Sequence, residues 1–383
     1  MKRWLTKPLG EVCDLVNGAP FKPSDWDGSG LPIIRIQNLN DPTKPFNYTS
    51  KNPAEKFRVR PGDTLLSWSG TPGTSFGCFR WDGPEGWLNQ HIFNVHLNAE
   101  VLPPFFIYQV NSKLEELIGK AHGGVGLQHI TKGALSSVKI TVPPLADQDR
   151  IVKLLDEADD LRKLRSQADR HTTALIEAVF HKMFGDVQRN SKEWPIKVVG
   201  DLCDLVRGSS PRPKSDPRYY GGAIPRLMIE DITRDGWLVT PRVDSLTELG
   251  ATMSRPVKAG TIVMAVSGNI GLCGQLAVDA CIHDGFVAFK DLRADLVLPL
   301  FFGIAMSQMR QAHQRNQAGA IFQNITTTDV KAMVIPLPPL SLQGDFCQRV
   351  AEIRGLEGEQ AVSRRRLDDL FQSMLHQAFE GDL

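Results

Sequence analysis

Five basic side chains and two tyrosines gather in one short stretch of the sequence. Residues 207–226 read RGSSPRPKSDPRYYGGAIPR and contain a single acidic residue, Asp216. Basic side chains neutralise nucleic-acid phosphates, and arginine also hydrogen-bonds to base edges. The stretch therefore predicts contact with DNA, although a solvated surface loop would have the same composition. The candidate residues are Arg207, Arg212, Lys214, Arg218, Tyr219, Tyr220 and Arg226.

Other polar residues that suit contact with DNA lie in loop-like segments near glycines. Small hydrogen-bond donors follow two apolar runs, and a glutamine follows each of two later segments that contain glycine. Because the glutamine recurs in both places, we expect it to contact the phosphate frame and not a particular base. Turn structure alone is an equally good explanation. These candidates are Ser67, Ser69, Thr71, Gln128, Ser267, Asn269 and Gln323, with Lys22 and Arg35 in the segment 17–35.

Residue patterns of common catalytic sites are missing from the sequence. An amino-methyltransferase needs a polar residue before Pro-Pro-aromatic, but Leu102 precedes Pro103-Pro104-Phe105, which indicates the start of a helix. Neither 70–73 nor 268–271 forms the strand-GxGxxG-helix unit of a nucleotide site. The adjacent Glu230 and Asp231 lack the positioned lysine of a nuclease. The sequence therefore predicts a protein that is not an enzyme and binds no cofactor or metal.

Composition limits the class of protein further. The chain has 383 residues, of which 42% are hydrophobic and 23% charged, as expected for about two globular domains. Its formal net charge is only +1, so a DNA-binding surface must be a local patch. We predict a cytoplasmic protein that does not enter a membrane, because no apolar run approaches the roughly 20 residues of a membrane span. Six scattered cysteines without a Cys-x-x-Cys pair indicate reduced core residues.

The sequence contains one unit twice. LGEVCDLVNG at 9–18 matches VGDLCDLVRG at 199–208, and QHIT at 128–131 matches QNIT at 323–326. The first part of each copy alternates short apolar runs with turn residues, which predicts strands, among them 64–66 and 92–95. One packed helix is predicted near the end of each, at 105–117 and at 301–313. A pair of prolines then ends each globular part, because the residue before proline avoids the helical conformation.

Each copy continues into a long segment with helical periodicity. Asp147 and Ser341 are the predicted N-caps, and apolar residues recur at heptad spacing in both segments. From Ile151 to Lys182 such a helix is roughly 47 Å long, which is compatible with DNA half-sites about one turn apart. Each helix needs a broad partner surface, which the other can provide. The predicted pairing residues are Ile151, Leu154, Leu161, Leu175, Val179, Phe346, Ile353, Leu356, Leu367, Leu370 and Met374.

These motifs resemble those of the specificity (S) subunit of Type I restriction-modification systems, over essentially the whole chain. VPPLADQDRIVKLLDEAD and LPPLSLQGDFCQRVAEI open the two helices, and FHKMFGD and LHQAFEGDL close them; Glu380 is an insertion in the last. The resemblance implies a non-catalytic subunit that reads a split sequence in double-stranded DNA. It also implies docking of two modification (methyltransferase) subunits and of restriction subunits, with S-adenosylmethionine and ATP bound by those partners.

The expected fold class is α+β, with two strand-rich α/β target-recognition domains separated by two long helices that pair as an antiparallel coiled coil. An internal pseudo-twofold repeat relates the copies. The expected domains are 1–144 and 196–339, the spacer helices 145–186 and 340–383, and the linker 187–195. Because the loops of the two copies differ, the bipartite target should be asymmetric. The alternatives are a fused enzyme, and a structural or inhibitory adaptor that keeps the helices but lacks specific DNA binding.

Overall fold

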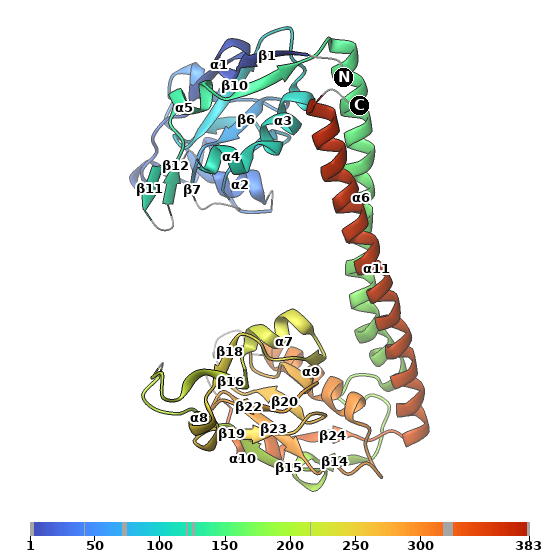
Figure 1. Cartoon of the computed structure of the whole chain (residues 1–383). Helices are drawn as coiled ribbons and strands as arrows, with labels where there is room; N and C mark the ends of the chain where they lie inside the picture. Colours follow the sequence, from blue (N-terminus) through green and yellow to red (C-terminus); the bar gives the residue numbers. More distant parts are fainter. Residues whose placement is uncertain are drawn as a thin grey trace. The chain divides into compact units, whose positions relative to one another are not determined.

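The computed structural model describes residues 4–41, 43–70, 75–119, 122–124, 127–214, 216–316 and 325–380, with the backbone alone at 70, 122–124, 127–128 and 310–316. The chain divides into two compact units (Figure 1). Unit 1 comprises Met1–Ala168 and Gln360–Leu383, and unit 2 comprises Asp169–Glu359. Each unit therefore contains one globular domain and part of each long helix.

Unit 1 is built on a four-stranded antiparallel sheet in the order β2-β10-β6-β8. Every residue of β6 and the first four residues of β10 are buried, which follows from their apolar runs. The strands predicted at 64–66 and 92–95 are thus confirmed. The four strands are β2 (Cys13–Asn17), β10 (Ile92–Leu97), β6 (Thr64–Ser67) and β8 (Gly77–Arg80).

Three further sheets are seen in the described part of unit 1. One has the order β4-β3-β9-β5, in which β3 and β9 are parallel, and comprises β4 (Asn47–Thr49), β3 (Leu31–Ile34), β9 (Gly86–Leu88) and β5 (Arg58–Val59). β1 (Leu5–Pro8) pairs with β13 (Lys139–Val142), which lies directly before the first long helix. The third sheet has the order β11-β12-β7 and comprises β11 (His122–Gly124), β12 (Leu127–His129) and β7 (Ser69–Gly70).

Unit 2 repeats this plan with a larger central sheet. Its five strands, in the order β15-β23-β20-β21-β17, are β15 (Asp204–Arg207), β23 (Phe286–Lys290), β20 (Ile262–Ala265), β21 (Cys273–Leu276) and β17 (Leu238–Val239). The second sheet comprises β18 (Asp244–Leu246), β16 (Tyr220–Leu227), β22 (Ala280–Ile282) and β19 (Arg255–Val257). β14 (Ile196–Val198) pairs with β24 (Val334–Pro336), as β1 does with β13.

Short helices connect and cover these sheets. In unit 1 they are α1 (Leu9–Val12), α2 (Ile36–Asn40), α3 (Pro103–Ser112), α4 (Leu114–Gly119) and α5 (Lys132–Ser136), with the 3-10 turns η1 (Pro23–Asp25) and η2 (Glu55–Phe57). In unit 2 they are α7 (Ile229–Asp235), α8 (Glu248–Thr252), α9 (Pro299–Asn316) and α10 (Thr327–Ala332), with η3 (Val199–Asp201). The helix predicted at 301–313 is confirmed within α9.

The single helix predicted at 105–117 is wrong, because the backbone leaves the helical conformation at Lys113 and two helices result. The break follows a tertiary contact at the end of α3. The Asn111 side chain donates to the carbonyl of Cys78 at 2.9 Å and accepts from its N–H at 2.8 Å. This exchange holds the end of α3 against β8.

The two long helices are α6 (Leu145–Phe184) and α11 (Leu340–Glu380), and each begins directly after its proline pair. The prediction of Asp147 and Ser341 as N-caps is wrong, because both lie inside the first helical turn. A residue not identified from the sequence ties each helix start to its domain. Gln148 is fully buried, accepts from Leu102 N at 2.8 Å and donates to the carbonyls of Glu100 and Pro143, each at 2.8 Å.

The long helices run antiparallel within each unit. In unit 1, Arg162 of α6 donates to Asp368 of α11 at 2.8 Å, while Thr141, just before α6, donates to the carbonyl of Phe379 at 3.4 Å. In unit 2, the rings of Phe180 and Phe184 lie 5.5 and 5.3 Å from that of Phe346, near the start of α11. The predicted antiparallel pairing of the two helices is therefore observed.

The predicted seam is only partly correct. Of the predicted pairing residues, Ile151 and Phe346 are buried, and Val179, Ile353, Leu367 and Met374 are half-buried. Leu154 is half-buried. The other predicted residues are exposed: Leu161 by 53%, Leu175 by 43%, Leu356 by 44% and Leu370 by 51%. The residues that follow Leu154 and Leu370, Leu155 and Phe371, are buried instead, because each helix packs against a globular domain as well as against the other helix. Val350 and Ala378 are buried in the same way.

The cores contain the cysteines, as predicted. Five of the six are buried and Cys347 is half-buried, and all are free thiols. Burial raises the pKa of Cys13 and of Cys203 to about 12, so both stay protonated at neutral pH. Across the described residues, no helix combines the length and the apolar composition needed to cross a bilayer.

Candidate nucleic-acid interface

The glycine that ends each repeated Cys-Asp-Leu-Val motif brings two loops together. A Cβ on Gly18 would lie 2.3 Å from the carbonyl oxygen of Asn89, and one on Gly208 would lie 2.1 Å from that of His283. Only glycine permits this approach. The loop after β2 is therefore held against the β9–β10 loop in unit 1, and the loop after β15 against the β22–β23 loop in unit 2.

A third and a fourth segment join these loops in each unit. The segment after β6 is attached through the backbone of Trp68. Its backbone N–H donates to the carbonyl of His91 at 3.4 Å, and its carbonyl accepts from the backbone N–H of Ile130 at 3.0 Å. In unit 2, Val266 makes the same two bonds, donating to Gly285 at 2.8 Å and accepting from Ile325 at 3.0 Å. We call residues 17–22, 68–70, 89–91 and 128–130 the unit-1 loop cluster, and 207–214, 266–271, 283–285 and 325 the unit-2 loop cluster.

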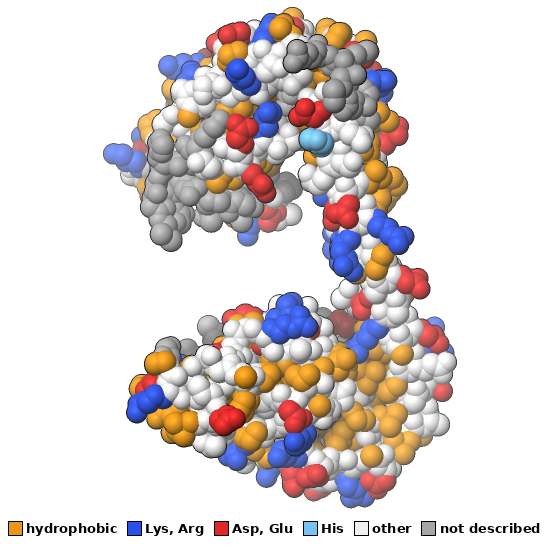
Figure 2. All heavy atoms as spheres, in the orientation of Figure 1, with side chains coloured by type: hydrophobic (Ala, Val, Ile, Leu, Met, Phe, Trp, Pro, Cys, Tyr) orange, Lys and Arg blue, Asp and Glu red, His pale blue; other side chains and the backbone are white. Residues whose placement is uncertain are grey.

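The unit-2 loop cluster presents exposed cations. Arg207, Arg212 and Lys214 are exposed, and Arg212 retains 63% of its side-chain accessibility. Arg207 donates to the carbonyl of Asp284 at 3.1 Å, and Arg212 lies 3.5 Å from the Asp284 carboxylate. Elsewhere, basic and acidic side chains are interspersed on the faces visible in Figure 2, in keeping with a net charge near zero. The cluster can therefore contact phosphates locally.

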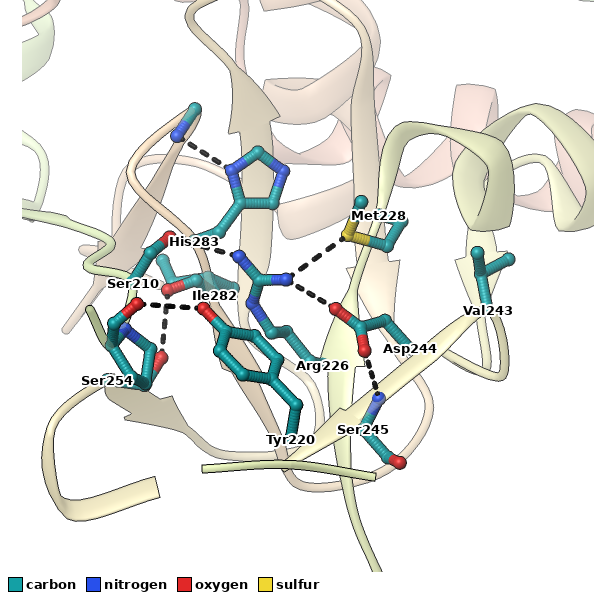
Figure 3. A network of polar contacts seen from close by, with 12 residues as sticks. Ser210, Tyr220, Arg226, Met228, Val243, Asp244, Ser245, Ser254, Ile282 and His283 are labelled. Atoms are coloured by element: carbon teal, nitrogen blue, oxygen red, sulfur yellow. Dashed lines mark hydrogen bonds and ion pairs between the residues drawn. The ribbon is translucent and has the colours of Figure 1, made fainter. Parts of the chain in front are cut away.

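Arg226 has a structural place that the sequence did not indicate (Figure 3). It is only 8% exposed, forms an ion pair with Asp244 and donates to Ser210 Oγ at 3.0 Å. Its guanidinium carbon lies 5.4 Å from the Tyr220 ring centroid, and the Tyr220 hydroxyl donates to the carbonyl of Pro211 at 2.8 Å. Because both side chains hold the loop 210–211, we no longer expect Arg226 and Tyr220 to contact DNA directly.

Arg218 and Tyr219 lie beside the loop before α8 and are not part of the loop cluster. Arg218 pairs with Asp216 through Nε at 3.1 Å and Nη2 at 2.7 Å, and its carbonyl accepts from the Thr247 hydroxyl. The Arg218 side chain is exposed and lies over the ring of the half-buried Tyr219 at 5.3 Å. The predicted basic stretch thus separates into residues 207–214, which belong to the unit-2 loop cluster, and residues 216–226, which lie outside it.

The candidates of unit 1 also separate. Lys22 is exposed within the loop cluster, whereas Arg35 is half-buried, donates to Asn47 Oδ1 at 3.1 Å and lies over the Trp26 ring. Ser67 is buried and donates to a backbone carbonyl, so direct contact with DNA is no longer expected of it.

The remaining candidates lie at or beside the loop clusters. The buried hydroxyl of Ser69 lies 2.6 Å from His129 Nδ1. The Gln128 backbone pairs with Gly70 in the sheet of β7 and β12. Ser267 and Asn269 are half-buried in the unit-2 loop cluster. Thr71, Gln323 and the Gln128 side chain lie outside the described residues.

An aromatic group in the unit-1 loop cluster was missed in the sequence. The Trp68 ring lies 5.6 Å from His91 and 5.9 Å from His129, and the two histidine rings lie 6.3 Å apart. Burial, with His129 nearby, lowers the pKa of His91, which keeps this ring neutral at pH 7. His91 and His129 are far apart in the sequence, and the pairing of β12 with β7 brings His129 beside His91.

The two units share a framework but differ in the side chains that they present, and comparison with known proteins identifies this duplication. A sequence model of the Type I restriction modification DNA specificity domain matches residues 1–169 and again residues 191–350. The chain belongs to the Type I DNA specificity family. Each match covers one strand-rich domain and the beginning of the long helix that follows it, to residue 169 within α6 and to residue 350 within α11.

Individual members of the specificity family resemble the chain over nearly its full length. The EcoBI specificity subunit of Escherichia coli is 22% identical over 99% of this chain and 86% of its own. The putative MjaX specificity subunit of Methanocaldococcus jannaschii is 23% identical over 92% of this chain and 87% of its own. A chain solved in work on complex assembly and conformational transition of the type I R-M system has a TM-score of 0.66 at 22% identity, covering 100% of this chain and 99% of that one. A crystal structure of a Type I S subunit from M. genitalium has a TM-score of 0.52 at 15% identity, covering 98% and 96%.

Proposed function

We propose that the chain is the DNA-recognition subunit of a Type I restriction-modification complex, in which each loop cluster reads one half of a split target in double-stranded DNA. One observation carries this proposal: the same four segments are joined by equivalent glycine and backbone contacts in both units, while their side chains differ. Backbone contacts that are the same in both units suit a constant position of each loop cluster on DNA. Side chains that differ between the units suit the reading of different bases.

The predicted target is asymmetric. The unit-1 loop cluster carries Trp68, His91 and His129, whereas the unit-2 loop cluster carries Arg207, Arg212 and Asp284. Aromatic and imidazole groups favour different base edges from those that guanidinium and carboxylate groups favour. Two identical inverted half-sites would contradict this reasoning.

Exposed leucines on the long helices support the docking of partners. Leu161 of α6 corresponds to Leu356 of α11, and Leu175 corresponds to Leu370; both pairs are 195 residues apart, as are the repeated segments 128–131 and 323–326. All four are exposed. A surface that is repeated in the sequence suits a partner that binds twice, which is why we assign it to two modification subunits. Restriction subunits join this assembly, and S-adenosylmethionine and ATP bind to the partner subunits.

Co-expression of the chain with its modification subunit tests the proposal. Methylated adenines across the host genome are mapped by long-read sequencing, with the modification subunit alone as the control. We expect one motif with two short, different, specified halves and a fixed gap. A stable complex that leaves no methylated motif would refute DNA recognition and favour the adaptor function. Methylation by the chain without a partner would instead revive the enzyme alternative.

A further inference from the structure

One carboxylate stands among the cations of the unit-2 loop cluster. Asp284 lies between β22 and β23, and its side chain is 51% exposed. Its carbonyl accepts from Arg207, and its carboxylate lies 3.5 Å from Arg212 Nη2. A carboxylate repels DNA phosphates, so its presence on a phosphate-binding surface needs another explanation.

The Asp284 side chain is held in a defined orientation by a supported serine. Ser210 Oγ donates to Asp284 Oδ1 at 2.6 Å, and Ser210 accepts from the buried Arg226 at 3.0 Å. The Tyr220 hydroxyl donates to the carbonyl of the next residue, Pro211, at 2.8 Å. One carboxylate oxygen is therefore fixed from within the domain. The other, Oδ2, faces the exposed Arg212 at the longer distance of 3.5 Å.

The ionised carboxylate limits what Asp284 can bind. Its pKa lies below the usual range, first because of the hydrogen bond from Ser210 and further because of the charges of His283 and Arg212. An ionised carboxylate only accepts hydrogen bonds. In the major groove, the donors that bases offer are the exocyclic amines, N4 of cytosine and N6 of adenine.

The equivalent residue of unit 1 has different hydrogen-bonding chemistry. Gly18 contacts Asn89 as Gly208 contacts His283, so the residues that follow, Gln90 and Asp284, occupy equivalent loop positions. Gln90 is half-buried, and its amide both donates and accepts. The same place in the framework thus carries an acceptor in unit 2 and a bifunctional amide in unit 1.

We propose that Asp284 determines specificity in unit 2 by accepting a hydrogen bond at Oδ2 from the exocyclic amine of a cytosine or an adenine. Arg207 and Arg212 contact the adjacent phosphates and offset the repulsion between these and the carboxylate. This inference rests on the DNA recognition proposed above and assigns one residue to one base pair within it.

The test is the variant Asp284→Asn in the full complex with the modification subunit. Asparagine keeps an acceptor for Ser210, removes the charge and adds two donors. We expect the specified base to change or relax at one position of one half, with discrimination there reduced about tenfold, while the other half and the gap stay the same. The base specified by the wild-type complex at that position distinguishes cytosine from adenine.

Asp279→Asn is the matched control. Asp279 lies before β22, whereas Asp284 lies after it, and it also pairs with a cation, Lys258 at 2.8 Å. Asp279→Asn removes one negative charge, as Asp284→Asn does, and we expect it to leave the methylated motif unchanged. A second variant, Asp284→Gln, installs the residue type of unit 1 and should also alter one position only.

Three outcomes would overturn the proposal. Asp284→Asn could leave the motif and its discrimination as in the wild type. It could raise affinity for all sequences equally, which would show that Asp284 only moderates the local charge. Failure of both Asp284 variants to assemble would assign the residue a structural role. In each case, a methylated motif produced by the wild-type complex still supports the proposed DNA recognition. A wild-type complex that produces no methylated motif refutes DNA recognition itself.

Discussion

Replacing Gln343 by methionine tests whether a buried amide secures the start of α11. Gln343 is fully buried and lies in the first turn of the helix. Its Oε1 accepts from Leu298 N at 2.8 Å, and its Nε2 donates to the carbonyls of Leu296 at 3.1 Å and Pro338 at 2.8 Å. It corresponds to Gln148, which makes the same three bonds at the start of α6.

Methionine has a similar length and shape but makes none of these bonds. The bond to Pro338 is buried, so its loss leaves a carbonyl without a partner at a cost of about 1–3 kcal/mol. The other two bonds are part-buried, and water can replace them in part, which adds about 1 kcal/mol together. We expect the free energy of unfolding to fall by about 2–4 kcal/mol, a large fraction of the roughly 5–15 kcal/mol of a typical domain.

Hydrogen exchange and urea unfolding of the full chain measure this change. The Leu298 amide should lose protection against exchange, and the core amides of unit 2 should lose protection at a lower urea concentration than in the wild type. Gln348→Met is the matched control, because Gln348 is exposed on the same helix and bonds only to the Glu352 side chain, at 3.2 Å. Equal effects of the two substitutions would refute the reasoning.

Three further predictions concern DNA binding, docking and stability. Arg212→Ala should weaken DNA binding by the complex and reduce the slope of log affinity against log salt by about 0.9, as expected for one phosphate contact. The control is Arg293→Ala, which removes an exposed arginine paired with an aspartate outside the loop clusters. It should change neither the affinity nor the slope. Leu161→Asp should reduce co-purification of the modification subunit, whereas Leu238→Asp, on a similarly exposed leucine of β17, should leave it unchanged. Arg226→Met should lower the free energy of unfolding by about 3 kcal/mol in denaturant titrations, because it leaves a partly buried carboxylate without its cation; an unchanged midpoint with weaker DNA binding would restore the original assignment of this residue.

Much of the organisation followed from the sequence because its signals are local. Three kinds of signal each determine the structure of only a few neighbouring residues. They are the repeated Cys-Asp-Leu-Val motif, the proline pairs before Leu145 and Leu340, and the apolar runs of β6 and β10. Proline restricts its neighbour, and side-chain alternation follows from the strand itself. These signals were sufficient to predict two repeated units, the proline pairs as the starts of the long helices, and the loops that carry polar residues.

Long-range contacts decided the rest. The heptad pattern placed Leu161 and Leu370 in the helix pair, but each helix also packs against a domain, and that second surface moved the buried series by one residue. Arg212 and Arg226 are both arginines of the same basic stretch and could not be distinguished from the sequence. In the structure, strand pairing places Arg226 beneath the loop 210–211, whereas Arg212 is exposed on the surface. Asp284 joined the candidate site because Gly208 permits the loop after β15 to approach the β22–β23 loop. Residue type determined which chemistry was present, and tertiary packing determined which groups remained free to use it.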